Sequence, residues 1–210
     1  NYICHPDLKP PFLCLLVSGG NSLIVKVNGY TDFEVIGRTR DDAAGEAYDK
    51  IARILHLGYP GGPKIDKLAK EGQPNIDLPK PHIENLDFSF SGIKTAVINL
   101  HHKNPDINKA DLCMSFEKAV TEVLVENITK AVEQTGVNKI VLAGGVSANT
   151  HIRSEFEKLE QKGIEIYKPD LKLCGDNAAM VGTDVYYTYK KGKIADLSLN
   201  VKATVNLENE

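Results

Sequence analysis

Two pairs of adjacent glycines each follow a short apolar run in this chain. Together, the two turns that they predict could form a nucleotide-binding site. One lies in Leu16-Val17-Ser18-Gly19-Gly20-Asn21 and the other in Ala143-Gly144-Gly145-Val146-Ser147-Ala148-Asn149. Glycine lacks a Cβ atom, so the backbone turns sharply there and its amides approach an anion closely. Ser147 is also placed to cap the following helix, whose first amides attract phosphate. Two ordinary tight turns are the alternative, because the chain has neither a GxGxxG nor a GxxxxGK[ST] motif.

Three carboxylates form a second candidate feature. Asp42, Glu46 and Asp49 are spaced at i, i+4 and i+7, so they share one face of a predicted helix. Like charges this close need a cation, a basic side chain or a hydroxyl-rich ligand to compensate them. The alternative is a solvated acidic face that Lys50 and Arg53 relieve.

Other polar residues carry weaker signals. Asp176 precedes a predicted helix, where an N-cap is the simplest local interpretation, and a single Asp cannot form a metal site. Ser91 is likewise interpreted as a helix cap, since its surroundings do not match the GxSxG motif of hydrolases. The six histidines form no HxxxH or HExxH pair, and we interpret them as non-catalytic. The four cysteines have no CxxC spacing, which argues against a zinc knuckle.

A mixed α/β fold would position these residues. Three strands joined by tight turns predict an antiparallel meander, and the later strand-helix-strand-helix pattern predicts a crossover with parallel strands. Together they indicate a ribonuclease-H-like α/β layer, with Asp41 or Asp42 capping the first helix. The expected strands cover 12–17, 22–27, 33–40, 139–143 and 164–167, and the expected helices cover 42–57, 64–71, 92–101, 109–135, 147–162 and 177–189.

Composition sets broad limits. The chain has 210 residues, of which 42% are hydrophobic and 25% are charged, as in ordinary globular proteins. A formal net charge of −3 argues against a generally basic nucleic-acid binder. The longest apolar run is far too short to span a bilayer, and no signal-peptide pattern is present. We therefore expect a cytoplasmic protein with no membrane partner.

Six motifs, taken in order, resemble the TsaD/Gcp/OSGEP family of tRNA threonylcarbamoyl transferases. The resemblance extends from about residue 10 to residue 190. It rests on Leu15-Leu16-Val17-Ser18-Gly19-Gly20, Asp41-Asp42-Ala43-Ala44-Gly45-Glu46-Ala47-Tyr48-Asp49-Lys50, Tyr59-Pro60-Gly61-Gly62-Pro63, Asp87-Phe88-Ser89-Phe90-Ser91-Gly92, Ala143-Gly144-Gly145-Val146-Ser147-Ala148-Asn149 and Cys174-Gly175-Asp176-Asn177.

The resemblance implies the two-lobed ASKHA fold (actin/hexokinase/Hsp70-like). Residues 1–11 would be a linker from an absent N-terminal lobe, and 12–194 the C-terminal lobe with a helical insertion at about 42–108. Residues 195–210 would form a tail. The implied reaction moves a threonylcarbamoyl group from threonylcarbamoyl-adenylate to the adenosine adjacent to the anticodon, in tRNAs that read codons beginning with A.

The resemblance also implies the roles of particular residues. Asp176 would be a catalytic metal ligand, holding one divalent metal, iron or zinc, that polarises the carbamoyl donor. The other ligands would come from an HxxxH helix upstream, so we expect the isolated fragment to be inactive. Asn21 departs from the His of many bacterial relatives. The implied substrate contacts are Leu16, Val17, Ser18, Gly19, Gly20, Asp49, Gly62, Asp66 and Asn149.

The implied partners are threonylcarbamoyl-adenylate or ATP/AMP, tRNA, and TsaB-like and TsaE-like helper proteins. Two alternatives remain open at this stage. One is a non-catalytic nucleotide-binding scaffold subunit of the same complex, which would not be expected to keep Asp49, Asp176 and the second glycine turn together. The other is a small-molecule kinase of the ASKHA superfamily, against which the loop from Tyr59 to Pro63 argues.

Overall fold

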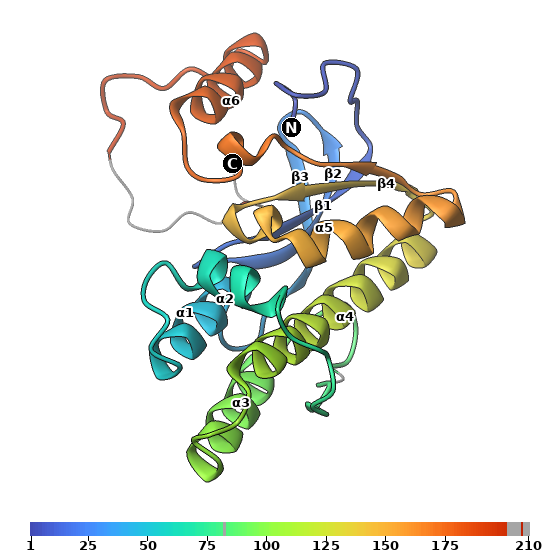
Figure 1. The fold of residues 1–210 in the computed structure, drawn as a ribbon. Helices are drawn as coiled ribbons and strands as arrows, with labels where there is room; N and C mark the ends of the chain where they lie inside the picture. The colour runs from blue at the N-terminus through green and yellow to red at the C-terminus, as the bar shows by residue number, and fades with distance from the viewer. Residues whose placement is uncertain (82, 201–206, 208–210) are drawn as a thin grey trace.

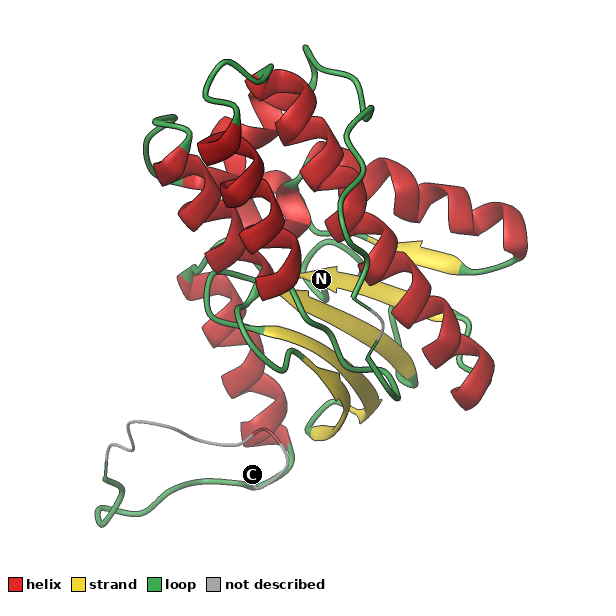
Figure 2. Ribbon diagram, turned by 90° about the horizontal axis from the view of Figure 1, so that it is seen from below, coloured by secondary structure: helices red, strands yellow, loops and turns green. Residues whose placement is uncertain are grey.

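One five-stranded mixed sheet organises the chain, as Figures 1 and 2 show. The computed structural model describes residues 1–81, 83–200 and 207, so His82 and most of the predicted tail lie outside the described residues. The strand order is β3-β2-β1-β4-β5, with β1, β2 and β3 antiparallel and β1, β4 and β5 parallel. The predicted meander and crossover are therefore confirmed. The strands are β1 Phe12–Val17, β2 Ser22–Gly29, β3 Asp32–Arg38, β4 Lys139–Ala143 and β5 Glu165–Tyr167.

Both faces of the central strand β1 are covered, which explains its unbroken apolar sequence. Leu13, Leu15 and Val17 point into the main core, which the helices of one side complete. Phe12 belongs to a smaller core on the opposite face, together with Leu8 of the N-terminal segment. The chain before β1 thus packs against the sheet.

The described residues form six α-helices, and none of them is long and apolar enough to cross a membrane. The predicted helix at 109–135 is confirmed at both ends. The Asn108 side chain accepts from the amides of Ala110 and Asp111 at the start, and left-handed Gly136 (φ 68°) ends the helix. The helices are α1 Ala44–Ile54, α2 Gly61–Ala69, α3 Ser91–Lys103, α4 Lys109–Thr135, α5 Thr150–Glu157 and α6 Ala178–Lys190. Helices α1 to α5 gather on one side of the sheet, and α6 lies apart from them (Figure 1).

The predicted caps of α1 and α3 are wrong. Helix α1 begins after Ala43, and the amide of Ala44 donates to Ser22 Oγ of the neighbouring strand at 2.9 Å. Helix α3 begins at Ser91 itself, so Ser91 does not cap it. Ser91 Oγ instead donates to Asp41 Oδ2 at 2.6 Å. In both places, a group that the local sequence assigned to helix capping bonds instead to a residue distant in the sequence.

The predicted caps of α5 and α6 are displaced along the chain. A short 3-10 turn, Gly145–Ala148, precedes α5, so Asn149 rather than Ser147 supplies the cap by accepting from the Ile152 amide at 2.9 Å. Asn177 rather than Asp176 caps α6 by accepting from the Met180 amide at 2.9 Å. The helix predicted at 64–71 also begins earlier, at Gly61.

Candidate functional site

The two glycine turns meet at one edge of the sheet. Strands β1 and β4 are parallel neighbours, so the loops that follow them leave the sheet at the same edge. Gly144 has a φ of +87°, and a Cβ atom there would lie 2.3 Å from the carbonyl oxygen of Val17. The second turn therefore lies directly against the end of β1, and only glycine fits at this position.

Helix α1 begins against the first glycine turn. The Gly45 amide donates to the Ser18 carbonyl oxygen at 3.1 Å. A Cβ atom on Gly45 would lie 2.6 Å from that oxygen and 2.8 Å from the Gly19 nitrogen. Within the turn, Ser18 Oγ accepts from the Asn21 amide at 3.0 Å, which fixes its shape.

A cavity of about 530 Å³ opens between these elements. Its size is that of a small-ligand site, and it joins both glycine turns to the sides of α1 and α2 and the start of α5. Of the predicted substrate residues, Gly19, Asp49, Gly62, Asp66 and Asn149 line it. The predicted contacts that do not line it are Leu16, Val17, Ser18 and Gly20, which precede or flank Gly19 in the first turn.

Asp49 is suited to bind a hydroxyl-rich ligand at this cavity. Its Oδ1 accepts from the Gly61 amide at 2.7 Å, at the first residue of α2. Its Oδ2 has no hydrogen-bond partner among the residues that the structure describes, and the side chain is half-buried. A carboxylate held by one oxygen presents the other as a fixed acceptor for ligand hydroxyls.

Asp66 and Asn149 are already engaged within the protein. Asp66 Oδ1 accepts from the Thr150 amide at 2.9 Å and from Thr150 Oγ1 at 2.7 Å, which ties α2 to α5. Asn149 Oδ1 caps α5, and Asn149 Nδ2 donates to Glu117 Oε1 at 2.5 Å. Both side chains line the cavity and also hold its walls together.

Sequence reasoning assigned no role to Tyr48, which lines this cavity, or to Glu117, which lies behind its wall. Glu117 is 1% exposed on α4, and burial raises its pKa to about 8. Tyr48 is buried against Phe116, with ring centroids 4.8 Å apart. The one available signal was that Glu117 follows Phe116 within the apolar stripe of its helix.

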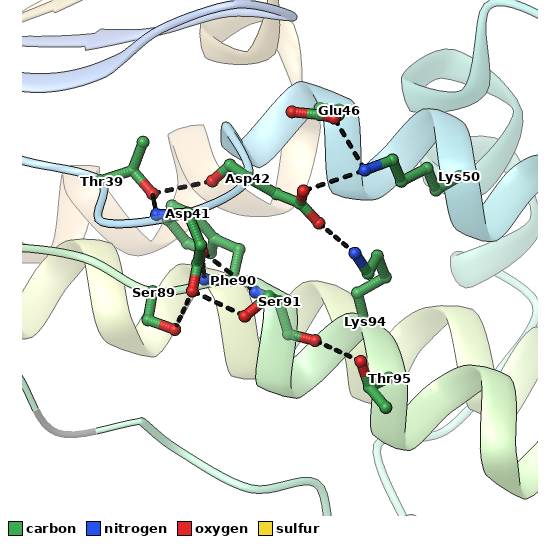
Figure 3. Close-up of polar contacts among 10 residues, drawn as sticks. All are labelled: Thr39, Asp41, Asp42, Glu46, Lys50, Ser89, Phe90, Ser91, Lys94 and Thr95. Atoms are coloured by element: carbon green, nitrogen blue, oxygen red, sulfur yellow. Dashed lines mark hydrogen bonds and ion pairs between the residues drawn. The ribbon is translucent and has the colours of Figure 1, made fainter.

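The three carboxylates at helical spacing do not act as one group. Asp42 lies before α1, where Lys50 bridges it to Glu46 with contacts of 2.9 and 2.7 Å, as Figure 3 shows. Lys94 of α3 also pairs with Asp42. Burial alone would raise the pKa of Asp42, but the two lysines lower it overall. The prediction that the three carboxylates share one helix face is wrong, because Asp42 precedes the helix. Lys50 compensates Asp42 and Glu46, while Asp49 binds the Gly61 amide.

Asp41 joins the start of α1 to the start of α3 (Figure 3). It accepts from Ser89 Oγ and Ser91 Oγ, each at 2.6 Å, and from the Phe90 amide at 2.8 Å. Partial burial would raise the pKa of Asp41, but these hydrogen bonds together lower it. Gly45, at the start of α1, hydrogen-bonds to Ser18 of the first glycine turn and lines the cavity, so the Asp41 cluster anchors the segment that leads into this wall.

Comparison with known proteins identifies the family. The sequence profile of tRNA N6-adenosine threonylcarbamoyltransferase matches residues 2–183. The chain belongs to this family. It is 53% identical over 215 aligned positions to the tRNA N6-adenosine threonylcarbamoyltransferase of Clostridium beijerinckii and 52% identical to that of Clostridium perfringens strain SM101. Each alignment covers 99% of this chain but 63% of the relative.

Solved structures confirm the ASKHA-like fold for this family member. Full-length HypF in its phosphate- and nucleotide-bound form aligns with a TM-score of 0.72 at 15% identity, covering 90% of this chain and 34% of HypF. Component A of the (R)-2-hydroxyglutaryl-CoA dehydratase of Acidaminococcus fermentans aligns with a TM-score of 0.53 at 20% identity, covering 90% and 64%. At these identities the likeness concerns the fold alone.

The metal that the family resemblance implied is not matched by a ligand set here. Among residues 1–81, 83–200 and 207, no three His, Cys, Asp or Glu side chains lie close enough together to hold an ion. Asp176 is exposed and is not among the residues that line the cavity. Arg153 ties the segment that leads to Asp176 to the second glycine turn. Its guanidinium donates to the carbonyl oxygens of Ser147 at 2.7 Å and Pro169 at 2.6 Å.

Proposed function

We propose that this protein transfers the threonylcarbamoyl group of threonylcarbamoyl-adenylate to the adenosine adjacent to the anticodon of tRNAs that read codons beginning with A. Its membership of the threonylcarbamoyltransferase family supports a transferase acting on tRNA. The observation that carries the proposal is the cavity in which both glycine turns, Asp49 and Gly62 meet. It has the size and the polar groups that an adenylate requires.

Each part of the cavity has a proposed role toward the adenylate. Asp49 Oδ2 accepts from a ribose hydroxyl, because the Gly61 amide already holds its other oxygen. Gly19 and Gly145 leave open space beside their backbones, since no heavy atom lies within 4 Å of a Cβ placed on either. A phosphate can therefore approach the backbone of both turns. Held in this way, the donor carries its carbamoyl group at a fixed position for attack by the adenosine amine.

The metal, the partners and the location remain part of the proposal. Asp176 would supply one ligand to a divalent iron or zinc ion, although the described residues hold no group of three His, Cys, Asp or Glu side chains that would complete the site. The chain spans 63% of the length of its curated relatives. We propose tRNA, and TsaB-like and TsaE-like helpers, as partners of the whole protein, acting in the cytoplasm.

Calorimetric titration with AMP tests the proposed site. Asp49→Ala removes the acceptor for the ribose hydroxyl, and we expect affinity to fall by about tenfold, near 1.4 kcal/mol, as for loss of a hydrogen bond to a charged group. Asp77→Ala is the matched control, because Asp77 is an exposed aspartate away from the cavity. Equal AMP affinity for Asp49→Ala and the unaltered protein would contradict the assignment.

A further inference from the structure

Glu117 is a buried acid with no assigned role in the proposed reaction. It lies on α4 with 1% of its surface exposed, one layer behind the cavity wall. Among the described residues, its carboxyl group accepts a hydrogen bond from Asn149, whose Nδ2 lies 2.5 Å from Glu117 Oε1. A buried carboxyl group costs free energy unless it is well bonded, so the position calls for an explanation beyond packing.

Asn149 links this acid to the cavity. The Asn149 side chain uses its oxygen to cap α5 and its nitrogen to reach Glu117, while the residue itself lines the cavity. An asparagine side chain can turn about its last bond and exchange its oxygen and nitrogen. The acceptor at Glu117 and the donor at the Ile152 amide together permit one orientation, in which the nitrogen points toward α4.

We propose that Glu117 is a positioning residue of the nucleotide site, which fixes the carboxamide of Asn149 and through it the wall formed by Asn149, Tyr48 and the start of α5. This inference rests on the proposed function, because it assigns Glu117 to the binding of the same adenylate. Glu117 acts through Asn149 and does not touch the ligand itself.

The ionisable groups around Glu117 determine how the affinity for AMP should depend on pH. The groups that face it are Tyr48 of α1, Asp66 of α2, Lys70 at the end of α2, and Cys113 of α4. Burial raises the pKa of Glu117 to about 8, the pKa of Cys113 to about 12, and the pKa of Tyr48 well above its usual value of 10. Between pH 7 and pH 9 Glu117 is therefore the group of this cluster that gains a negative charge.

That charge lies behind a cavity proposed to hold an anionic ligand. The second ionisation of a phosphate is near pH 6, so the charge of AMP is constant above pH 7. Ionisation of Glu117 adds repulsion in a partly buried site, where charges interact more strongly than in water. Affinity for AMP should consequently fall as the pH rises through about 8.

Titration calorimetry with AMP at pH 7 and pH 9 tests this role with two substitutions. Glu117→Gln keeps an acceptor for Asn149 Nδ2 and cannot ionise, so we expect affinity within twofold of the unaltered protein at pH 7 and no further loss at pH 9. Glu117→Leu removes the acceptor, and we expect about tenfold weaker binding at pH 7. Glu133→Gln, an exposed position on the same helix, is the control and should follow the unaltered protein at both pH values.

The outcomes separate this inference from the proposed function. If the unaltered protein binds AMP and Glu117→Gln loses affinity at pH 9 as the unaltered protein does, the positioning role is overturned while the nucleotide site stands. If the unaltered protein binds no AMP, the proposed nucleotide site fails and the role of Glu117 fails with it. Should Glu117→Leu not fold, the pH comparison with Glu117→Gln decides alone.

Discussion

Gly45 is the point at which helix α1 touches the first glycine turn, so Gly45→Ala tests how the cavity is built. In an open helix position, replacing glycine by alanine stabilises a protein by about 0.5–1 kcal/mol. At Gly45 the new Cβ atom would lie 2.6 Å from the Ser18 oxygen and 2.8 Å from the Gly19 nitrogen. Both are backbone atoms, so neither can swing aside as a flexible side chain would.

The expected loss follows from two contributions. Moving α1 away weakens the hydrogen bond from the Gly45 amide to the Ser18 oxygen, worth about 1 kcal/mol. Overpacking at a rigid contact costs about 1–3 kcal/mol. After subtracting the gain in helix propensity, we expect Gly45→Ala to lower the free energy of unfolding by about 1–3 kcal/mol.

Urea unfolding followed by circular dichroism measures this change, and α6 provides the control. Gly182 lies inside that helix with no heavy atom within 4 Å of a Cβ placed on it. Gly182→Ala should therefore raise the urea midpoint or leave it unchanged. If Gly45→Ala is as stable as Gly182→Ala, the close contact between α1 and the first glycine turn is refuted.

Three further predictions concern ionisable groups and caps. Asp41→Ala should lower the free energy of unfolding by about 2 kcal/mol at pH 7 in urea titrations, and since the pKa of Asp41 is lowered in the fold, this difference should shrink as the pH falls through that value. The pKa of Glu117 is raised from 4.5 to about 8 in the fold, so the unaltered protein should lose stability as the pH rises through this range. Thermal unfolding should show a loss of roughly 4 kcal/mol relative to Glu117→Gln between pH 5 and pH 9. A flat difference would contradict that burial. Asn177→Ala should lower the free energy of unfolding by about 1 kcal/mol by removing the cap of α6, whereas Asp176→Ala should change thermal stability little. A larger loss for Asp176→Ala than for Asn177→Ala would show that Asp176 is the cap.

The sequence was sufficient for features that are local or periodic. The strand Phe12–Val17 and the helix Lys109–Thr135 were predicted at both ends, because an unbroken apolar run and a long apolar stripe each specify one structure. The two glycine turns were also located correctly, since strands that pair in parallel bring their ends to one edge. These features rely on neighbours in the chain or on general rules of topology.

The helix starts could not be predicted because their partners lie far away in sequence. Asp41 bonds to Ser89 and Ser91, 48 and 50 residues later, and so does not cap the helix that follows it. The amide of Ala44 instead uses Ser22, 22 residues earlier. Local capping rules cannot choose between a near and a distant partner of equal chemistry.

The inner layer of the candidate site was missed for the same reason. Glu117 and Asn149 are 32 residues apart, and nothing in either local sequence pairs them. Asp49 was recognised by its spacing from Asp42, although helix α1 begins after Asp42 and the two serve different partners. Asp49 lines the cavity, and the family resemblance had implied it as a substrate contact, whereas the argument from one shared acidic face is wrong.

A crystal structure of the protein with AMP would show whether the cavity between the two glycine turns binds an adenylate. We predict that the ribose hydroxyls lie within hydrogen-bonding distance of Asp49 Oδ2, roughly 2.6–3.2 Å, and that the phosphate lies against the backbone of Gly19 or Gly145. AMP bound elsewhere, with the cavity between the two glycine turns filled only by solvent, would contradict it.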